Sequence, residues 1–330
     1  MNSDINIRLA TDSDKPQILQ LIDTVFKEQQ HFAWVRDEKY WQWKYELNIF
    51  GKTNIYIAEL NGKIIASSSL WSWKFICRGE ILKTYQPCDT IVDPEYQGKG
   101  LFNYINKKRI LLSKKENISF LFNFPNKNSL PGNLKIGWEF LKNIEWVVKP
   151  LKPFNLLFNL RDKSKANPQE IHQDHRLNTD DCYTIAAKYQ SYDGLIKTYR
   201  DEGFFRWRYT DHPFFKYGMV IAEKSKKSAG AIFIVNAKNK IREMIVVDVF
   251  GSNQLTPELF RRLTETGKQY NVDYITTIYN RYYNMHTLWK QGFIKVRNKN
   301  MVVLPLDLAL EPKLLDYANW SLIGAMHDSL

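Results

Sequence analysis

The chain has 330 residues, of which 44% are hydrophobic and 14% aromatic, and it carries a formal net charge of +12. This length suits two domains of ordinary size, and the apolar content excludes an intrinsically disordered protein. The positive charge would favour any anionic partner, but the sequence holds no nucleic-acid-binding signature and no apolar run of the roughly 20 residues that a membrane helix needs.

The first half of the chain alternates between expected strands and helices. Asn61-Gly62 is a hairpin signal between two of the strands, and the mixture of hairpins and strand-to-helix turns predicts an α/β layer fold with a mixed sheet. In chain order, we expect a strand at 5–9, a helix capped by Thr11 or Ser13, a helix at 37–47, strands at 55–60, 63–73 and 81–92, a helix at 98–115, a strand at 118–124 and a helix at 126–136.

Two stretches of the chain look alike at an offset of 164 positions (204 − 40 = 164). The hexapeptide at 40–45, YWQWKY, resembles FFRWRY at 204–209, and the IAE tripeptide at 57–59 recurs at 221–223. Both hexapeptides are expected to fill the core rather than to bind a ligand. A repeat of this length exceeds the units of a solenoid, so we predict two copies of one domain.

The boundary between the copies is expected where an apolar stretch gives way to a polar one. The sequence KPLKPFNLLFNL is followed by RDKSKANPQEIHQDHRLNTDD, which is typical of a connection. We therefore predict a first domain at residues 1–150, a linker at 151–178, and a second domain with a C-terminal tail at 179–330.

A glycine-containing loop, DPEYQGKGLF at 93–102, follows an apolar strand and opens a helix. Gly98 and Gly100 would let successive backbone amides turn toward one point, where the positive end of the helix dipole suits a pyrophosphate. Lys99 and Lys107–Arg109 would add positive charge. The loop therefore predicts a phosphate site, with an ordinary strand-to-helix turn as the alternative.

The strand exit Val92-Asp93-Pro94 and the segment 97–100, QGKG, resemble the acyl-coenzyme A loop of the GNAT acetyltransferase superfamily. The family pattern is Gln or Arg, two residues, Gly, one residue, and then Gly or Ala. This sequence departs from the pattern at the last place, which is Phe102. The resemblance implies two tandem GNAT-like domains, each a mixed, mostly antiparallel twisted sheet flanked by helices.

The resemblance also implies which residues hold the cofactor, acetyl-CoA or another acyl-CoA. Backbone groups of three strand residues would face the pantetheine arm: Thr90, Ile91 and Val92. Backbone amides of the loop would hold the pyrophosphate: Gln97, Gly98, Lys99, Gly100, Leu101 and Phe102. Asn126 and Ser129 match a second family element and would flank the pantetheine and phosphates.

The second family element lacks one chemical group. It ends at Gly137-Trp138, and many members carry a tyrosine four residues before that glycine, as general acid to the leaving thiolate. Asn133 occupies this position, so the usual acid is missing. In the second copy, the corresponding loop at 249–257 has one glycine and no Gln-x-x-Gly, so we expect this copy to keep the fold without binding CoA.

Acyl transfer to an amine needs a base for the amine proton and donors for the oxyanion. Asp89 lies on the strand that would face the thioester, where partial burial would raise its pKa. Its alternative role is structural, because Asp248 repeats it in the second copy. Tyr85 could replace the missing acid, or else pack. Asp328, in the C-terminal tail, could return to the site, or the tail could be exposed.

The cysteines, Cys77, Cys88 and Cys182, are odd in number, and neither they nor the six histidines show metal-ligand spacing. Acidic residues near the start argue against an export signal. We therefore predict a cytoplasmic protein that binds no metal and no nucleic acid and does not insert into a membrane.

These features together predict an N-acyltransferase that moves an acetyl or similar group directly from acyl-CoA to a primary amine of a small molecule. The two-copy layout with FPN at 124–126 and Gly137-Trp138 resembles members found with bacterial polysaccharide synthesis, which suggests an amino sugar or a nucleotide-linked amino sugar as the acceptor. An amino acid, peptide or polyamine acceptor is an alternative, and so is a non-catalytic acyl-CoA sensor or scaffold. The oligomeric state stays open, with a homodimer among the options.

Overall fold

The computed structural model describes residues 4–26, 37–159, 164, 167–190, 194–279 and 285–327. The chain divides into two compact units. The first unit comprises Met1–Phe75, Glu80–Lys142 and Asn300–Asn319, and the second comprises Ile76–Gly79, Asn143–Lys299 and Trp320–Leu330. This division differs from the expected boundary at residue 150, because a segment from late in the chain completes the first unit.

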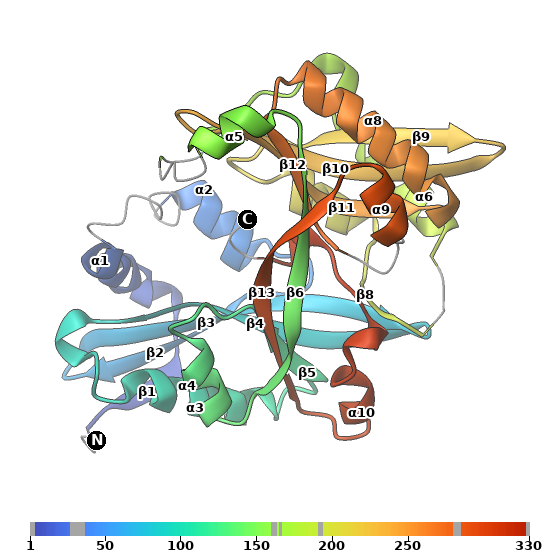
Figure 1. Ribbon diagram of the computed structural model, residues 1–330. Coiled ribbons are helices and arrows are strands. Elements are labelled where there is room, and N and C mark those ends of the chain that lie inside the picture. The colour runs from blue at the N-terminus through green and yellow to red at the C-terminus, as the bar shows by residue number, and fades with distance from the viewer. Residues whose placement is uncertain are drawn as a thin grey trace. The chain divides into compact units, whose positions relative to one another are not determined.

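The sheet of the first unit is mixed and mostly antiparallel (Figure 1). Its strands follow the order β1-β2-β3-β4-β5-β13. The β1–β2, β2–β3 and β5–β13 pairs are antiparallel, whereas β4 and β5 are parallel. The strands are β1 (Asn6–Leu9), β2 (Asn54–Leu60), β3 (Lys63–Cys77), β4 (Glu80–Val92), β5 (Phe120–Asn123) and β13 (Ile294–Pro305).

Helices cover both faces of this sheet, with α1 and α2 on one face and α3 and α4 on the other (Figure 1). Leu101 and Ile105 of α3 pack into a buried cluster with Tyr56 and Leu70 of the sheet. The helices are α1 (Lys15–Phe26), α2 (Glu38–Trp41), a π-helix (Gln42–Glu46), α3 (Leu101–Ser113), α4 (Leu130–Lys135) and α10 (Glu311–Leu314). The expected helices at 98–115 and 126–136 thus begin later than the sequence indicated.

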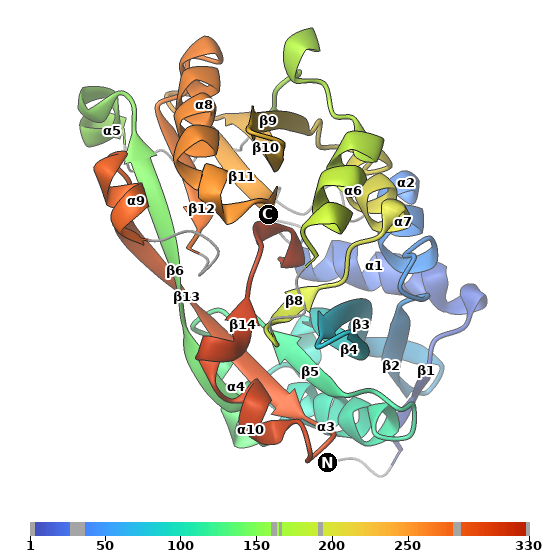
Figure 2. The ribbon, with the colours of Figure 1, turned by 90° about the vertical axis from the view of Figure 1, so that its right-hand side faces the viewer.

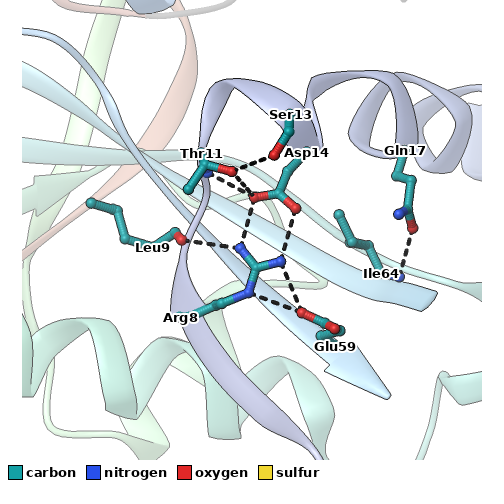
Figure 3. Close-up of polar contacts among 8 residues, drawn as sticks. All are labelled: Arg8, Leu9, Thr11, Ser13, Asp14, Gln17, Glu59 and Ile64. Carbon is teal, nitrogen blue, oxygen red and sulfur yellow. Dashed lines mark hydrogen bonds and ion pairs between the residues drawn. The ribbon is translucent and has the colours of Figure 1, made fainter. Parts of the chain in front are cut away.

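A charged network fastens the start of α1 to the edge of the first sheet (Figure 3). Arg8 on β1 donates from Nη1 and Nη2 to both carboxylate oxygens of Asp14, at 2.7 and 2.8 Å, and from Nε to Glu59 on β2 at 2.9 Å. Asp14 also accepts from the backbone amide of Thr11 at 2.7 Å, which caps the first turn. The guanidinium of Arg8 therefore holds two strands and a helix start together.

The second unit repeats the plan of the first. Its strands follow the order β6-β12-β11-β10, with β9 and β7 both paired to β10. The pairs β6–β12 and β10–β11 are antiparallel, and β11–β12 is parallel. The strands are β6 (Glu139–Pro150), β7 (Asn167–Pro168), β9 (Gly218–Lys224), β10 (Lys227–Ala237), β11 (Arg242–Gly251) and β12 (Tyr274–Ile278), with a separate parallel pair of β8 (Ile196–Thr198) and β14 (Trp320–Ser321).

Two long helices of the second unit, α8 and α6, lie on opposite faces of β10 and β11 (Figure 2). The segment expected as a linker is partly ordered into α5 and β7, because Pro168 and Asn167 pair with Asn236 and Ala237 of β10. The helices are α5 (Pro153–Asn159), α6 (Thr179–Lys188), α7 (Glu202–Phe205), a π-helix (Arg206–Thr210), α8 (Thr256–Gln269) and α9 (Met285–Lys290).

The two aromatic hexapeptides occupy the same place in the two units. Each begins in a short helix, α2 or α7, and continues as a π-helix. Their aromatic side chains are buried, which confirms the core role that the sequence predicted: Tyr40, Trp41, Trp43, Tyr45, Phe204, Phe205, Trp207 and Tyr209. The matching irregular helix in both units supports the duplication.

Candidate functional site

The loop after β4 is tied down at its start. Asp93 accepts from the amide of Glu95 at 3.0 Å and pairs with Lys63 at 2.8 Å. The side chain of Gln97 donates from Nε2 to the carbonyl of Val92 at 3.0 Å. Gln97 therefore closes the loop through its side chain, and the carbonyl of Val92 is engaged by the protein itself.

Beyond Gln97 the backbone turns so that a row of amides at the start of α3 has no acceptor within the described chain. Gly98 and Gly100 have φ of +73° and +79°, and a side chain carbon added at either would meet no atom within 4 Å. Among the described residues, no hydrogen-bond acceptor serves the amides of residues 98–103. Unpaired amides at the positive end of a 13-residue helix form a ready anion site.

Two side chains of the loop fold away from these amides. The ammonium of Lys99 donates to the carbonyl of Glu95 at 2.8 Å and lies 5.2 Å from the ring centre of Tyr96. The ring of Phe102 packs toward Gly132 of α4. If Gly132 carried a Cβ atom, that atom would lie only 3.1 Å from Cε1 of Phe102. The departure from the family pattern at Phe102 is thus accommodated by a glycine opposite it, and the amide of Phe102 remains available.

β4 and β5 separate beside this loop. The two strands pair in parallel at Thr84 with Phe120 and at Tyr85 with Leu121. The other edge of β5 pairs with β13. In the described part of the chain, no strand pairs with that edge of β4 from Gln86 to Val92. The edge offers backbone groups to an extended ligand, and the chain continues from it into the loop with the unpaired amides.

Asp89 lies near the C-terminal end of β4 with a φ of +47°, which marks a break in the regular strand. Its Oδ2 accepts from the hydroxyl of Tyr45 at 2.6 Å and pairs with Nζ of Lys44 at 2.7 Å. Burial raises the pKa of Asp89, but the attraction of Lys44 and the hydrogen bonds outweigh it, so the pKa lies below its ordinary value. The expectation of a raised pKa is therefore wrong, because the sequence did not reveal the lysine.

The same arrangement occurs in the second unit. Asp248 on β11 accepts from the hydroxyl of Tyr209 at 2.8 Å and from Arg200 at 2.6 Å. Burial raises the pKa of Asp248, because its effect is larger than the lowering by Arg200. A tyrosine of the π-helix thus holds an aspartate of the central strand in both units, which favours the structural role for Asp89.

Tyr85 is occupied by partners at the other end of β4. Its hydroxyl donates to Glu116 at 2.6 Å and accepts from the side chain of Asn54 at 3.3 Å. Burial and the neighbouring Glu116 raise the pKa of Tyr85 above its ordinary value. A phenol that holds its proton this firmly is a weak acid at neutral pH, so the role of general acid stays a prediction without support from this geometry.

Asn126 and Ser129 form a local turn at the start of α4. Oδ1 of Asn126 accepts from the amides of Asn128 and Ser129, both at 2.9 Å, and from the Ser129 hydroxyl at 3.1 Å. Their contact with a cofactor stays a prediction. Asn133 is buried, and within the described residues its Nδ2 has no hydrogen-bond partner.

The C-terminal tail packs within the second unit. Trp320 pairs with β8 through β14, and His327 is buried beside Lys299, with 2.9 Å between their nitrogens. Asp328 lies outside the described residues. The prediction that this residue acts in catalysis is therefore untested.

The loop of the second unit that corresponds to the cradle is closed. Gly251 has a φ of +100°, and a side chain carbon there would stand 2.5 Å from the Cα of Ala229 on the neighbouring strand. The amide of Ser252 donates to the carbonyl of Ser228 at 2.8 Å. The glycine serves close strand packing here, and the expectation that the second copy does not bind CoA stays a prediction.

Sequence reasoning missed Ser68 and Lys44 of the first unit and did not foresee the burial of Arg109. Arg109 was expected to add surface charge near the phosphates, but its side chain is 1% exposed and donates to Ser68 of β3. The signal available for Ser68 was a run of three serines, 67–69, inside an otherwise apolar strand. Lys44 was also missed, because its partner Asp89 is distant in sequence.

Comparison with known proteins follows this geometry. Residues 6–141 match the acetyltransferase (GNAT) domain family. No curated protein matches the chain. Among the described residues, no helix could span a membrane, and no group of three or more histidine, cysteine, aspartate or glutamate side chains could hold a metal ion.

Solved structures share the fold over 92% of this chain. A GCN5-related N-acetyltransferase from Anabaena variabilis has a TM-score of 0.64 at 11% identity, with 73% of its chain covered. A probable N-acyltransferase from Enterococcus faecalis has a TM-score of 0.60 at 12% identity, with 73% covered. N-myristoyltransferase from Saccharomyces cerevisiae, with bound myristoyl-CoA, has a TM-score of 0.53 at 11% identity, with 83% covered.

These similarities confirm the predicted fold of two tandem GNAT-like domains. The helix-start cradle and the separated strand both lie within the segment that matches the acetyltransferase domain family. Residues 6–141 thus resemble a GNAT acetyltransferase domain, and the solved structures add a shared fold over 92% of the chain.

Proposed function

We propose that the first unit binds acetyl-CoA, with the pyrophosphate on the amides of residues 98–103 and the pantetheine arm along Thr90, Ile91 and Val92. The observation that carries this proposal is the row of unpaired amides under open space at Gly98 and Gly100. The unpaired edge of β4 beside it supports the placement of the arm, because an extended amide-bearing chain can pair with a strand edge.

The chemical step in this proposal is direct transfer of the acyl group to a primary amine. The amine must attack as the neutral base, and the oxyanion must be met by donors. Asp89 stays ionised but is a weak base, since Lys44 and Tyr45 stabilise its charged form. We therefore assign Asp89 to holding the break in β4, and a different group, or water, to accepting the proton.

The acceptor in this proposal is an amino sugar or a nucleotide-linked amino sugar. Its support is the resemblance of the two-copy layout and loop to members of the superfamily found with polysaccharide synthesis. The net charge of +12 also suits an anionic nucleotide sugar better than a polyamine. A free amino acid or peptide amine remains the second choice of acceptor, and an acyl-CoA sensor is the non-catalytic alternative.

Binding of the donor is tested by calorimetry with acetyl-CoA. Gly100→Ala adds a methyl group inside the cradle, and we expect it to weaken binding at least tenfold. Gly62→Ala is the matched control, because Gly62 has a nearly identical φ of +78° and equally open space, but lies in the β2–β3 hairpin. Equal affinity of the Gly100→Ala and Gly62→Ala variants would contradict the placement of the phosphates.

Catalysis and the acceptor are tested by thiol release from acetyl-CoA with a panel of amines. The panel comprises amino sugars, nucleotide-linked amino sugars, amino acids and polyamines, and a longer acyl-CoA serves as a second donor. We expect the fastest release with a sugar amine. Tight binding of acetyl-CoA without thiol release from any amine would favour the sensor.

A further inference from the structure

Arg109 is a buried cation without a carboxylate partner. It lies on α3 with its side chain 1% exposed, and among the described residues no aspartate or glutamate forms an ion pair with it. Its Nη1 donates to the hydroxyl of Ser68, and it lies 3.5 Å from the hydroxyl of Thr90, while its Nε has no hydrogen-bond partner in the described chain. Burial lowers the pKa of Arg109 to about 9.

Cys88 and Tyr56 also lie near Arg109, but neither supplies a carboxylate, so burying this charge is costly and the arrangement calls for an explanation. Ser68 is 0% exposed, whereas Thr90 is partly exposed and lies on β4 beside the proposed path of the pantetheine arm. Arg109, Ser68 and Thr90, here called the hydroxyl relay, therefore run from a buried cation to a partly exposed hydroxyl on β4.

The chemistry of the hydroxyl relay sets the direction of its hydrogen bonds. A guanidinium has donors only, so the Ser68 oxygen accepts from Arg109. The proton of Ser68 then needs an acceptor, and the Thr90 oxygen lies 2.8 Å away. If Thr90 donated instead, the buried Ser68 proton would be left unpaired, at a cost of about 1–3 kcal/mol. The Thr90 hydroxyl is therefore left to donate outward.

The second unit provides an internal comparison. Asp248 matches Asp89 through its tyrosine partner, so Val249 stands at the place of Thr90. The strand neighbour of Val249 is Ala231, which is 0% exposed, at the place of Ser68. The same fold thus forms with two apolar residues there. The hydroxyl pair is not required by the fold, and it occurs only in the unit that has the cradle.

We propose that Thr90, oriented by Ser68 and Arg109, donates a hydrogen bond to a carbonyl oxygen of the acyl-pantetheine arm. The carbonyl belongs to the thioester or to a pantetheine amide, and both have the same acceptor chemistry. This inference rests on the proposed function. Thr90 is a binding residue in this arrangement, and Arg109 and Ser68 are positioning residues.

The experiment compares three ligands by calorimetry: acetyl-CoA, CoA, and 3′-phospho-ADP, which is the nucleotide half without any carbonyl. Thr90→Val removes the donor and keeps the shape, and we expect about fivefold weaker binding of acetyl-CoA with unchanged binding of 3′-phospho-ADP. A loss for acetyl-CoA alone identifies the thioester carbonyl, and an equal loss for CoA identifies a pantetheine amide. Thr84→Val is the matched control on the same strand, since the buried Thr84 hydroxyl has no partner among the described residues.

The outcomes separate this inference from the function on which it rests. Unchanged binding of acetyl-CoA by the Thr90→Val variant, or an equal loss for 3′-phospho-ADP, would overturn the role of Thr90 while leaving the function intact. No binding of acetyl-CoA by the unaltered protein would instead overturn the proposed function.

The positioning role of Arg109 is tested by Arg109→Met on two backgrounds. We expect a loss of acetyl-CoA affinity on the unaltered background and no further loss in the presence of Thr90→Val, because the two changes remove the same interaction. Equal losses on both backgrounds would contradict positioning. The Thr90→Val comparison decides the proposal even where the arginine variant does not fold.

Discussion

Replacing Asp89 with asparagine would leave the ammonium of Lys44 buried without its carboxylate. The Lys44 side chain is 2% exposed and lies 2.7 Å from Asp89, whose own side chain is 19% exposed. Removing one partner of such a pair costs about 3–5 kcal/mol. The rings of Tyr40 and Tyr45, 5.7 and 5.6 Å from the Lys44 nitrogen, would offset about 1 kcal/mol of this loss. We therefore expect Asp89→Asn to destabilise the first unit by about 2–4 kcal/mol.

Urea unfolding followed by circular dichroism measures this change, and thiol release at low temperature measures activity in the folded fraction. Adding Lys44→Met to Asp89→Asn should recover part of the stability, since no charge is then left buried. The structural role of Asp89 predicts that the folded variant keeps most of its turnover. An Asp89→Asn variant with unaltered stability and a hundredfold lower kcat would refute this reasoning and restore Asp89 as a base.

The pH dependence of the same variant has a definite sign. Because the folded-state pKa of Asp89 is depressed, its contribution to stability is fully present above the unfolded value of about 3.9 and is lost as the pH falls through the folded-state pKa. The stability difference between the unaltered protein and Asp89→Asn should therefore shrink in acid. A difference that grows in acid would contradict the assignment.

Two further variants test the architecture. Arg8→Met should destabilise the first unit by about 1–2 kcal/mol at neutral pH, a range that allows for the partial exposure of Arg8. The variant should also lose less stability in acid than the unaltered protein, because Arg8 holds the pKa of Asp14 well below its ordinary range. Urea unfolding between pH 2 and pH 7 measures both effects. Tyr209→Phe should lower the free energy of unfolding by about 2 kcal/mol, because the hydrogen bond to Asp248 is lost. Calorimetry should show an unchanged affinity for acetyl-CoA, and a weaker affinity would mean that the second unit takes part in donor binding.

The sequence predicted the duplication and the loop for different physical reasons. The hexapeptides were visible because large aromatic side chains in a core tolerate few replacements, and the loop was visible because Gly98 and Gly100 need positive φ. The sequence could not reveal that Val302 and its neighbours in β13 would pair with β5, since pairing across so long a separation depends on the whole fold. The polar partners of Asp89 and Arg109 were hidden for the same reason.

The duplication also shows which residues the fold needs and which the chemistry needs. Asp89 and its tyrosine have counterparts in Asp248 and Tyr209, in a unit whose loop is closed by strand packing at Gly251. A residue pair that persists where no cradle exists is explained by the architecture, so its presence in the first unit is weak evidence for catalysis. Residues of the first unit that have no counterpart in the second are stronger evidence for a role in the chemistry. The two glycines with open space around them, Gly98 and Gly100, and the hydroxyl pair of Ser68 and Thr90 have no counterpart at the matching places of the second unit, where Gly251 is packed against Ala229 and Val249 pairs with Ala231. They are therefore the residues whose replacement should affect the thioester rather than the fold.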